Sequence, residues 1–360
     1  MDFDALQARI AQRIDSRTKP PGALGRIEAL AAQIAALQAT TAPRMARCTL
    51  TIFAADHGIA AEGVSAFPQA VTRQMVQNFL AGGAAANVFA RTLGVDLQVV
   101  DAGVAGAPID HPGLVAHRLG AGTASFLDAP AMTDAQAARA LDCGAAVVRG
   151  TPGEALAFGE MGIANTATAA ALAHKLTGLP LARLVGRGTG LDDAGLARKL
   201  DVLTRACNRV PGRLAPDRAL AEYGGFEIGM IAGAMRAAAG DGRLVLVDGF
   251  IATAAAVLAL AHDPGIRPAL VFAHRSAEAG HGALLDWLEA RPLLDLDMRL
   301  GEGTGALLAW PLVQAAARMM TDMAGFDDAG VSAGVTGGGA TGSTVVGDAV
   351  TGDGPAGAGG

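Results

Sequence analysis

The chain is poor in aromatic and charged residues. Aromatic residues make up 4% and charged residues 17% of the 360 residues, whereas hydrophobic residues reach 51%. This balance is typical of a well-buried α/β protein, or of a protein that also buries surface in an oligomer. The net charge is −6 and no long stretch is basic. Nucleic acid is therefore not an expected partner, because nothing would neutralise its phosphates.

Cysteine is scarce as well. Cys48, Cys143 and Cys207 lie far apart and form no CxxC pair, so neither a disulfide framework nor a thiolate zinc site is expected, and a reducing cytoplasm is the expected location. The start of the chain is acidic where a signal peptide would be basic, and the longest apolar run, residues 251–261, is too short to span a bilayer. We therefore expect a soluble protein without a membrane partner.

Residues 2–38 show a helical periodicity with one break. Apolar residues recur at a spacing of four from Leu6 to Ile14, KPPG interrupts the pattern at residues 19–22, and a second helical pattern follows. No strand pattern precedes Cys48, so this end is predicted to belong to a helical subdomain.

From Cys48 onward, short β-branched runs end in a glycine or a charged residue, and a helical pattern follows each of them. Continuous apolar runs that alternate with helices are typical of a parallel sheet covered on both faces. In such a sheet, ligands bind at the carboxyl ends of the strands. We therefore predict a doubly wound, mostly parallel, Rossmann-like α/β nucleotide-binding domain over residues 45–285. The predicted strands are residues 49–54, 97–100, 184–185, 244–247 and 270–272.

Residues 331–360 consist mainly of glycine, alanine, serine, threonine and valine. This composition is typical of a flexible tail, and we expect the segment to be disordered and without catalytic function.

The most informative motif is RLGEGTG at residues 299–305, which an apolar run follows at once. Glycines on both sides of Glu302 let the backbone approach a ligand closely, and free N–H groups at a helix start can bind an anion. Glu302 is therefore a candidate to take a proton from a substrate. The alternative is that its carboxylate only complements a helix dipole.

Two more glycine-rich loops suggest a ligand. GRGTG at residues 186–190 could cradle a phosphate through backbone N–H groups and the Thr189 hydroxyl, although its spacing fits neither a P-loop nor a Rossmann fingerprint and a plain tight turn is the alternative. GEMGIANT at residues 159–166 opens an alanine-rich helix, with Asn165 as a candidate cap. The functional interpretation is that Glu160 is a second carboxylate facing the same crevice.

Three further segments carry polar or flat side chains. The pair DH at residues 56–57 ends the first predicted strand, but the other histidines show no metal-ligand spacing, so we expect the pair to fix a loop by hydrogen bonds. The sequence HRS at residues 274–276 could meet a phosphate or carboxylate, or lie in a solvated loop. Residues 63–79 could line a slot for an aromatic ring, or form a core-packing helix.

No GxSxG elbow and no Cys–His nucleophile pattern is present. The residues alone thus indicate an enzyme with carboxylate acid–base groups and phosphate-binding loops, acting on a nucleotide or phosphoribosyl substrate without a redox cofactor.

The same loops, in the same order, resemble the nicotinate-nucleotide–dimethylbenzimidazole phosphoribosyltransferases, which prepare the lower ligand of cobalamin. The similarity covers residues 17–330, and agreement at so many separated loops is specific. The matching stretches are KPPGALG (19–25), ADHGIAAEGVSAFPQAVTRQMVQNFLAGGAA (55–85), GEMGIANTATAAAL (159–172), GRGTGLDD (186–193), EYGGFEIGMIAGAM (222–235), VDGFIATAAA (247–256), AHRSAEAGH (273–281) and LDLDMRLGEGTGA (294–306).

This resemblance implies transfer of phosphoribose from nicotinate mononucleotide to 5,6-dimethylbenzimidazole, with inversion at the anomeric carbon. The products would be nicotinate and α-ribazole 5′-phosphate, for assembly of the cobalamin nucleotide loop. The resemblance implies no cofactor and no metal. It also implies a homodimer in which a small helical domain from both chain ends, here residues 1–44 and 286–330, closes the neighbouring subunit's site.

The resemblance also assigns roles to single residues. Glu302 would be the general base, and Glu160 would lie near the reacting base. The residues expected to hold the nucleotide are Gly162, Asn165, Gly186, Gly188, Thr189, Gly190, Lys199, Asp248, Arg275 and Ser276. Those expected to contact the acceptor base are Ser65, Phe67, Pro68, Gln74 and Met161.

The chain departs from the family's pattern at three positions. Ala164 and Ala167 stand where glycine and threonine are expected, and Ala23 replaces a frequent serine. A methyl group at position 164 would crowd a phosphate or strain a turn with positive φ. Two other functions remain as alternatives. A non-catalytic nucleotide-binding sensor of the same fold would not need both glutamates, whereas the missing GxGxxG and ribose-binding acid argue against an NAD-linked oxidoreductase.

Overall fold

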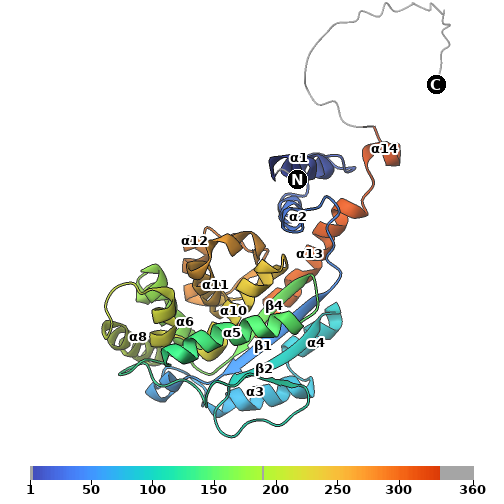
Figure 1. Ribbon diagram of the computed structural model, residues 1–360. Coiled ribbons are helices and arrows are strands. Elements are labelled where there is room, and N and C mark those ends of the chain that lie inside the picture. The colour runs from blue at the N-terminus through green and yellow to red at the C-terminus, as the bar shows by residue number, and fades with distance from the viewer. Residues whose placement is uncertain (1–2, 189, 333–360) are drawn as a thin grey trace, which may run out of the picture.

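The centre of the molecule is a six-stranded parallel sheet with the order β3-β2-β1-β4-β5-β6. Figure 1 shows β2, β1 and β4 of this sheet. The computed structural model describes residues 3–188 and 190–332, so Thr189 and nearly all of the tail predicted at 331–360 lie outside the described residues. The strands are β1 (Cys48–Ala55), β2 (Asp96–Gly103), β3 (Leu114–Ala116), β4 (Ala155–Met161), β5 (Leu244–Val247) and β6 (Leu270–Phe272).

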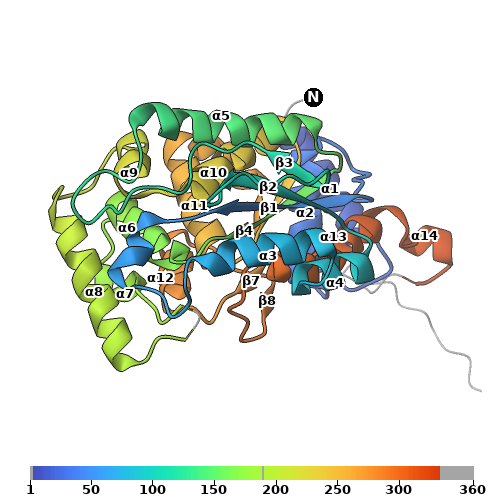
Figure 2. The same cartoon turned by 90° about the horizontal axis from the view of Figure 1, so that it is seen from below.

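Helices cover both faces of this sheet, which confirms the doubly wound α/β fold (Figure 2). Side chains of β1 alternate between the two cores, with Phe53 in one cluster and Ile52 in the other, as the period of two in a strand requires. One face carries α5 (Asp134–Gly150), α6 (Asn165–Thr177), α10 (Phe226–Gly240) and α11 (Phe250–His262). The other carries α3 (Ala70–Ala81), α4 (Ala85–Leu93) and α13 (Thr304–Thr321).

Small residues allow these helices to lie unusually close together. A Cβ atom added to Gly144 of α5 would lie 1.8 Å from the carbonyl oxygen of Met230, and one added to Gly233 of α10 would lie 2.0 Å from that of Leu141. The backbones of α5 and α10 are therefore in direct contact, which no larger side chain would permit. This packing is why the chain needs so few aromatic residues to fill its core.

The remaining elements lie outside these two layers. They are η1 (Gly58–Glu62), α7 (Leu181–Leu184), α8 (Asp193–Asn208), α9 (Pro216–Tyr223), η2 (Pro264–Ala269), α12 (Ala279–Trp287), α14 (Phe326–Ala329), and the two-stranded parallel sheet of β7 (His274–Arg275) and β8 (Leu294–Asp295). Among the described residues, no helix is long and apolar enough to cross a membrane.

The two ends of the described chain meet. Helices α1 (Phe3–Asp15) and α2 (Arg26–Leu37) confirm the predicted helical start, and Arg13 Nε donates to the carbonyl of Met320 in α13 at 3.1 Å. The apolar side chains of these three helices belong to the same cluster as one face of the sheet. The boundaries of a small helical domain at residues 1–44 and 286–330 stay a prediction.

One predicted strand is wrong and a central strand was missed. Residues 184–185 do not form a strand, because the chain makes one helical turn, α7, directly after Pro180. Leu184 is the last residue of that turn and Val185 is its C-cap. The missed strand, β4, pairs with both β1 and β5. Its sequence ALAFGEM contains no β-branched residue and only one aromatic residue, Phe158, so propensity gave only a weak signal for it.

Candidate active site

A cavity of about 300 Å³ opens at the carboxyl ends of β4 and β5. The chain runs from β1 outward to β2 and β3, then returns to place β4 on the other side of β1. The β1–β4 border is therefore the switch point at which doubly wound sheets bind ligands. The cavity is lined by residues from the loops after β1, β4, β5 and β6, from α3, and from the loop before α13.

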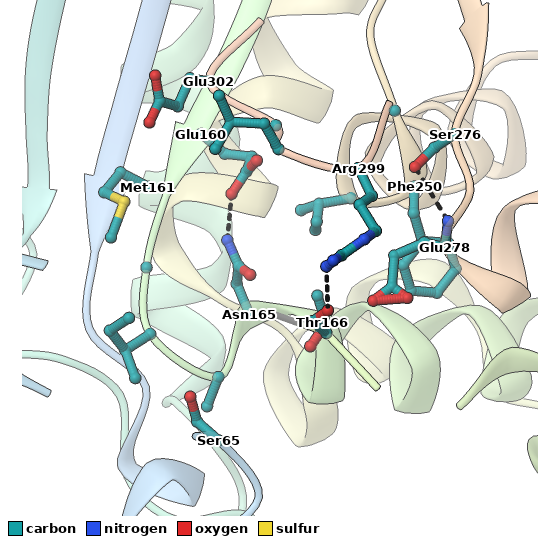
Figure 3. Close-up of a pocket in the computed structure, with 18 of the residues that line it drawn as sticks. Ser65, Glu160, Met161, Asn165, Thr166, Phe250, Ser276, Glu278, Arg299 and Glu302 are labelled. Carbon is teal, nitrogen blue, oxygen red and sulfur yellow. Dashed lines mark hydrogen bonds between the residues drawn. The ribbon is translucent and has the colours of Figure 1, made fainter. Parts of the chain in front are cut away.

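Glu160 is the first carboxyl group of the cavity. It is the last residue but one of β4. The missed strand, and not a helix start, therefore places Glu160 at the carboxyl end of the sheet. Asn165 Nδ2 donates a hydrogen bond to its Oε2 (Figure 3). Burial raises the pKa of Glu160 well above its ordinary value, and the nearby carboxylates of Asp248 and Glu227 raise it further. Both effects favour the neutral acid of Glu160 over its ionised form.

Glu302 is the second carboxyl group and stands in a strained loop. Gly301, Glu302 and Gly303 all have positive φ, at 85°, 61° and 81°, a conformation that costs an ordinary residue about 1–2 kcal/mol. A Cβ atom at Gly159 would lie 2.5 Å from the carbonyl carbon of Glu302, so this glycine of β4 makes room for the loop. Burial raises the pKa of Glu302, while the Ala86 N–H, 3.5 Å from its Oε2, opposes the shift.

Asp248 follows β5 and accepts a hydrogen bond from the backbone just after the Glu302 loop. Its Oδ1 accepts from the Ala306 N–H at 2.9 Å, in the first turn of α13. His274 Nε2 lies 3.8 Å from the same oxygen. Burial raises the pKa of Asp248, and His274 and the backbone N–H groups partly offset the rise. Asp248 thus fixes the helix that begins directly after Glu302.

The opposite end of the cavity is cationic. Lys199 on α8 is buried and donates to Thr166 Oγ1 at 2.8 Å and to the Gly186 carbonyl at 3.1 Å. Burial lowers its pKa to about 8, although Glu278 acts in the other direction. Arg299 reaches into the same region and donates to the carbonyl of Gly188 at 3.4 Å (Figure 3).

The wall beside the two glutamates is mostly apolar. Of the residues predicted to contact an acceptor base, Ser65, Phe67 and Met161 line the cavity, together with Val71 and Met75 of α3. The other two do not reach it: Pro68 and Gln74 are exposed and outside the cavity lining. Position 74 lies on the outer face of α3, one residue away from the face that carries Met75 inward.

The residues predicted to hold a nucleotide divide in the same way. Gly162, Asn165, Gly188, Lys199, Asp248 and Ser276 line the cavity. Arg275 does not, because its side chain turns toward Asp295, 3.9 Å away in β8. Gly186 and Gly190 are also outside the lining, although the Gly186 carbonyl anchors Lys199. Thr189 is outside the described residues.

The sequence matches the DBI_PRT family, described as phosphoribosyltransferase, over residues 3–331. The chain belongs to this family. It is 55% identical over 332 residues to the nicotinate-nucleotide–dimethylbenzimidazole phosphoribosyltransferase of Cupriavidus necator. This alignment covers 91% of this chain and 96% of the relative. It is 54% identical over 331 residues to the protein of the same name from Aromatoleum aromaticum, with coverage of 91% and 96%.

Solved structures give the same result. A crystal structure of CobT from Thermus thermophilus superposes with a TM-score of 0.89 at 47% sequence identity, covering 92% of this chain and 100% of that chain. The fold of the family and that of this chain therefore agree over nearly the whole length.

Several residues of this family member's cavity were not assigned from sequence. Phe250 and Ile251 line it, but they begin an apolar helix whose sequence predicts a place in the hydrophobic core. Glu278 and Arg299 line the end of the cavity where Lys199 lies, and Figure 3 shows both side chains. Arg299 is the residue that sequence reasoning could have found, because it lies within the RLGEGTG motif.

The DH pair at the end of β1 fixes a loop, as predicted. Asp56 Oδ2 accepts from the Ala105 N–H at 2.7 Å, and His57 bonds to Glu227 and Thr168. Among the described residues, no three His, Cys, Asp or Glu side chains are placed to hold a metal ion together.

Proposed function

We propose that this cavity transfers phosphoribose from nicotinate mononucleotide to 5,6-dimethylbenzimidazole. The products are nicotinate and α-ribazole 5′-phosphate, which enters assembly of the cobalamin nucleotide loop. One observation carries the proposal: two buried carboxyl groups with raised pKa values share a cavity with a cationic end. Relatives at 54–55% identity are named for this reaction.

Glu302 acts as the general base in this proposal. One benzimidazole nitrogen attacks C1′ of the ribose while the other loses its proton, and a carboxylate within hydrogen-bond reach takes that proton. The raised pKa of Glu302 makes it a stronger base than an exposed glutamate. Val71, Met75 and Met161 supply the apolar wall for the flat ring.

Glu160 supports the reaction in its neutral form. Asn165 occupies one of its oxygens, so the carboxylic acid can donate from the other to the ring or ribose. Because the proton stays on Glu160, this residue orients the substrate and does not compete with Glu302 for the transferred proton.

Lys199 and Arg299 bind the phosphate end. Nicotinate mononucleotide has a cationic ring nitrogen, so its leaving group departs neutral at that atom. Positioning the two substrates and providing one base are therefore sufficient for the step. Gly188 and the start of α6 complete the phosphate site, where Thr166 shares Lys199.

A homodimer in the cytoplasm is part of the same proposal. Leu300 lines the cavity and is 54% exposed, and Leu296 and Trp287 are 52% and 44% exposed near it in the chain. Exposed large apolar side chains beside a ligand cavity suit a second copy that closes the site. The free cysteines fit a reducing compartment.

The direct test mixes the purified protein with the two substrates and follows nicotinate release and α-ribazole 5′-phosphate by chromatography. Both products should accumulate together and in equal amounts. Tight binding of the nucleotide without either product would favour the alternative of a non-catalytic nucleotide sensor.

A further inference from the structure

A chain of three polar side chains lies in the core directly behind the cavity. His57 Nε2 and Glu227 Oε1 are 2.7 Å apart, and His57 Nδ1 and the Thr168 hydroxyl are 2.9 Å apart. All three residues are fully buried and none lines the cavity. Burying an imidazole and a carboxylate costs free energy even when they are paired. Their place in an otherwise apolar core therefore requires a reason beyond packing.

The three residues join the elements that form one wall of the cavity. His57 follows β1, Glu227 lies in the first turn of α10, and Thr168 lies near the start of α6. The same helix α6 begins with Asn165, whose amide donates to Glu160. A bond that fixes Thr168 therefore also fixes the direction of Asn165.

Two glycines hold the imidazole ring in place. A Cβ atom at Gly162 would lie 2.9 Å from His57 Nε2, and one at Gly225 would lie 2.4 Å from His57 Cε1 and 2.7 Å from Glu227 Oε2. The backbone of each glycine thus lies against the ring, and Gly162 belongs to the turn between Glu160 and Asn165. The turn between Glu160 and Asn165 therefore packs directly against the His57 ring.

Glu227 also acts on Glu160 through its charge. Its second oxygen, Oε2, has no hydrogen-bond partner among the described residues. Three other groups face Glu160: the Asp248 carboxylate after β5, the Asn165 amide on α6 and the backbone N–H of Glu302 before α13. Of these, only Asp248 adds to the effect of Glu227, whereas the two hydrogen bonds favour the ionised form of Glu160.

We propose that His57, Thr168 and Glu227 are positioning residues for Glu160, which lock the turn that carries Asn165 and set a buried carboxylate behind Glu160. This inference rests on the proposed function, in which Glu160 works as a carboxylic acid. Removing the Glu227 charge then lets Glu160 ionise at lower pH, and removing the Thr168 hydroxyl loosens the turn.

The first test is Glu227→Gln, which keeps an oxygen to accept from His57 and removes the charge. The basic limb of kcat, where Glu160 loses its proton, should move to lower pH by about one unit. Infrared difference spectra should show the carboxylic-acid band of Glu160 disappearing at correspondingly lower pH, with Glu160→Gln identifying the band. Glu154→Gln, at the other end of β4, removes the same charge and should shift neither.

The second test is Thr168→Val, which keeps the shape and removes the hydroxyl. We expect kcat to fall about tenfold with the KM for nicotinate mononucleotide unchanged, and Thr168→Ser to restore it. Thr204→Val, on the exposed face of α8, is the matched control.

Loss of thermal stability alone, with kcat, the pH profile and the infrared titration as in the wild type, would overturn the inference and leave the three residues as core structure. If the wild-type protein does not convert the two substrates, the proposed function fails. The infrared titration of Glu160 in Glu227→Gln then still decides this inference.

Discussion

Glu160, Glu302 and Asp248 are carboxyl groups shielded from water, and burial raises the pKa of each. Lys199 is shifted in the opposite sense, to about 8, for the same reason. Burial disfavours whichever form is charged, so both ends of the cavity move toward neutrality. The pKa of each of these residues therefore depends on its burial as well as on its residue type.

Glu302→Gln tests the base. Glutamine is nearly isosteric but cannot take the proton, so turnover should fall by roughly 10²–10⁴-fold while folding stays normal. Nucleotide affinity should change little, because the cationic end of the cavity is separate. Steady-state kinetics and nucleotide titration measure both quantities, with the exposed Glu289→Gln as control. Full turnover in folded Glu302→Gln would move the role of base to Glu160.

Lys199 predicts a pH dependence of nucleotide binding. Its pKa of about 8 means that it is cationic below that pH and neutral above it, so phosphate affinity should weaken as pH rises past about 8. In Lys199→Arg the guanidinium stays charged, and this part of the pH dependence should vanish. Calorimetric titration of nicotinate mononucleotide across this range measures it. A flat affinity profile in the wild type would exclude Lys199 from phosphate binding.

At the scale of elements, periodicity predicted α1, α2, β1, β2, β5 and β6, because their apolar patterns match their geometry. It failed for β4, whose glycine, Gly159, is needed where the Glu302 loop lies against the strand. The glutamates at 160 and 302 stood out as carboxylates among glycines. The sequence did not show which face of α3 or of β7 points toward the cavity. Gln74 and Arg275 were therefore assigned to a cavity that they do not line.

The start of α6 predicts a gain in stability on mutation. Ala164 is its N-cap and has φ of 74°, and Ala39, after α2, has φ of 50°. Glycine at either position should raise the free energy of unfolding by about 0.5–1 kcal/mol, because it removes the left-handed strain but adds freedom to the unfolded chain. Chemical denaturation measures both. Only Ala164→Gly should also change nucleotide affinity, because Ala39 is distant from the cavity lining.

At the scale of the whole molecule, we predict a homodimer. The exposed apolar side chains at Trp287, Leu296 and Leu300 would be covered by the second copy. Light scattering at micromolar protein should give twice the 36.0 kDa of the chain. Leu300→Glu should shift the equilibrium toward monomer and reduce turnover together. A wild-type monomer with full activity would contradict the prediction.

The buried carboxyl groups of the cavity also imply that folding takes up protons. The unfolded chain ionises these groups near pH 4, whereas in the folded chain Glu160, Glu302 and Asp248 keep their protons to higher pH. Between about pH 4 and these raised pKa values, the folded state therefore binds more protons than the unfolded state. The free energy of unfolding falls as pH rises through this range. The melting temperature should therefore be less sensitive to pH in Glu160→Gln than in the wild type. Ionising Glu302, which the proposed general base requires, therefore lowers the stability of the fold.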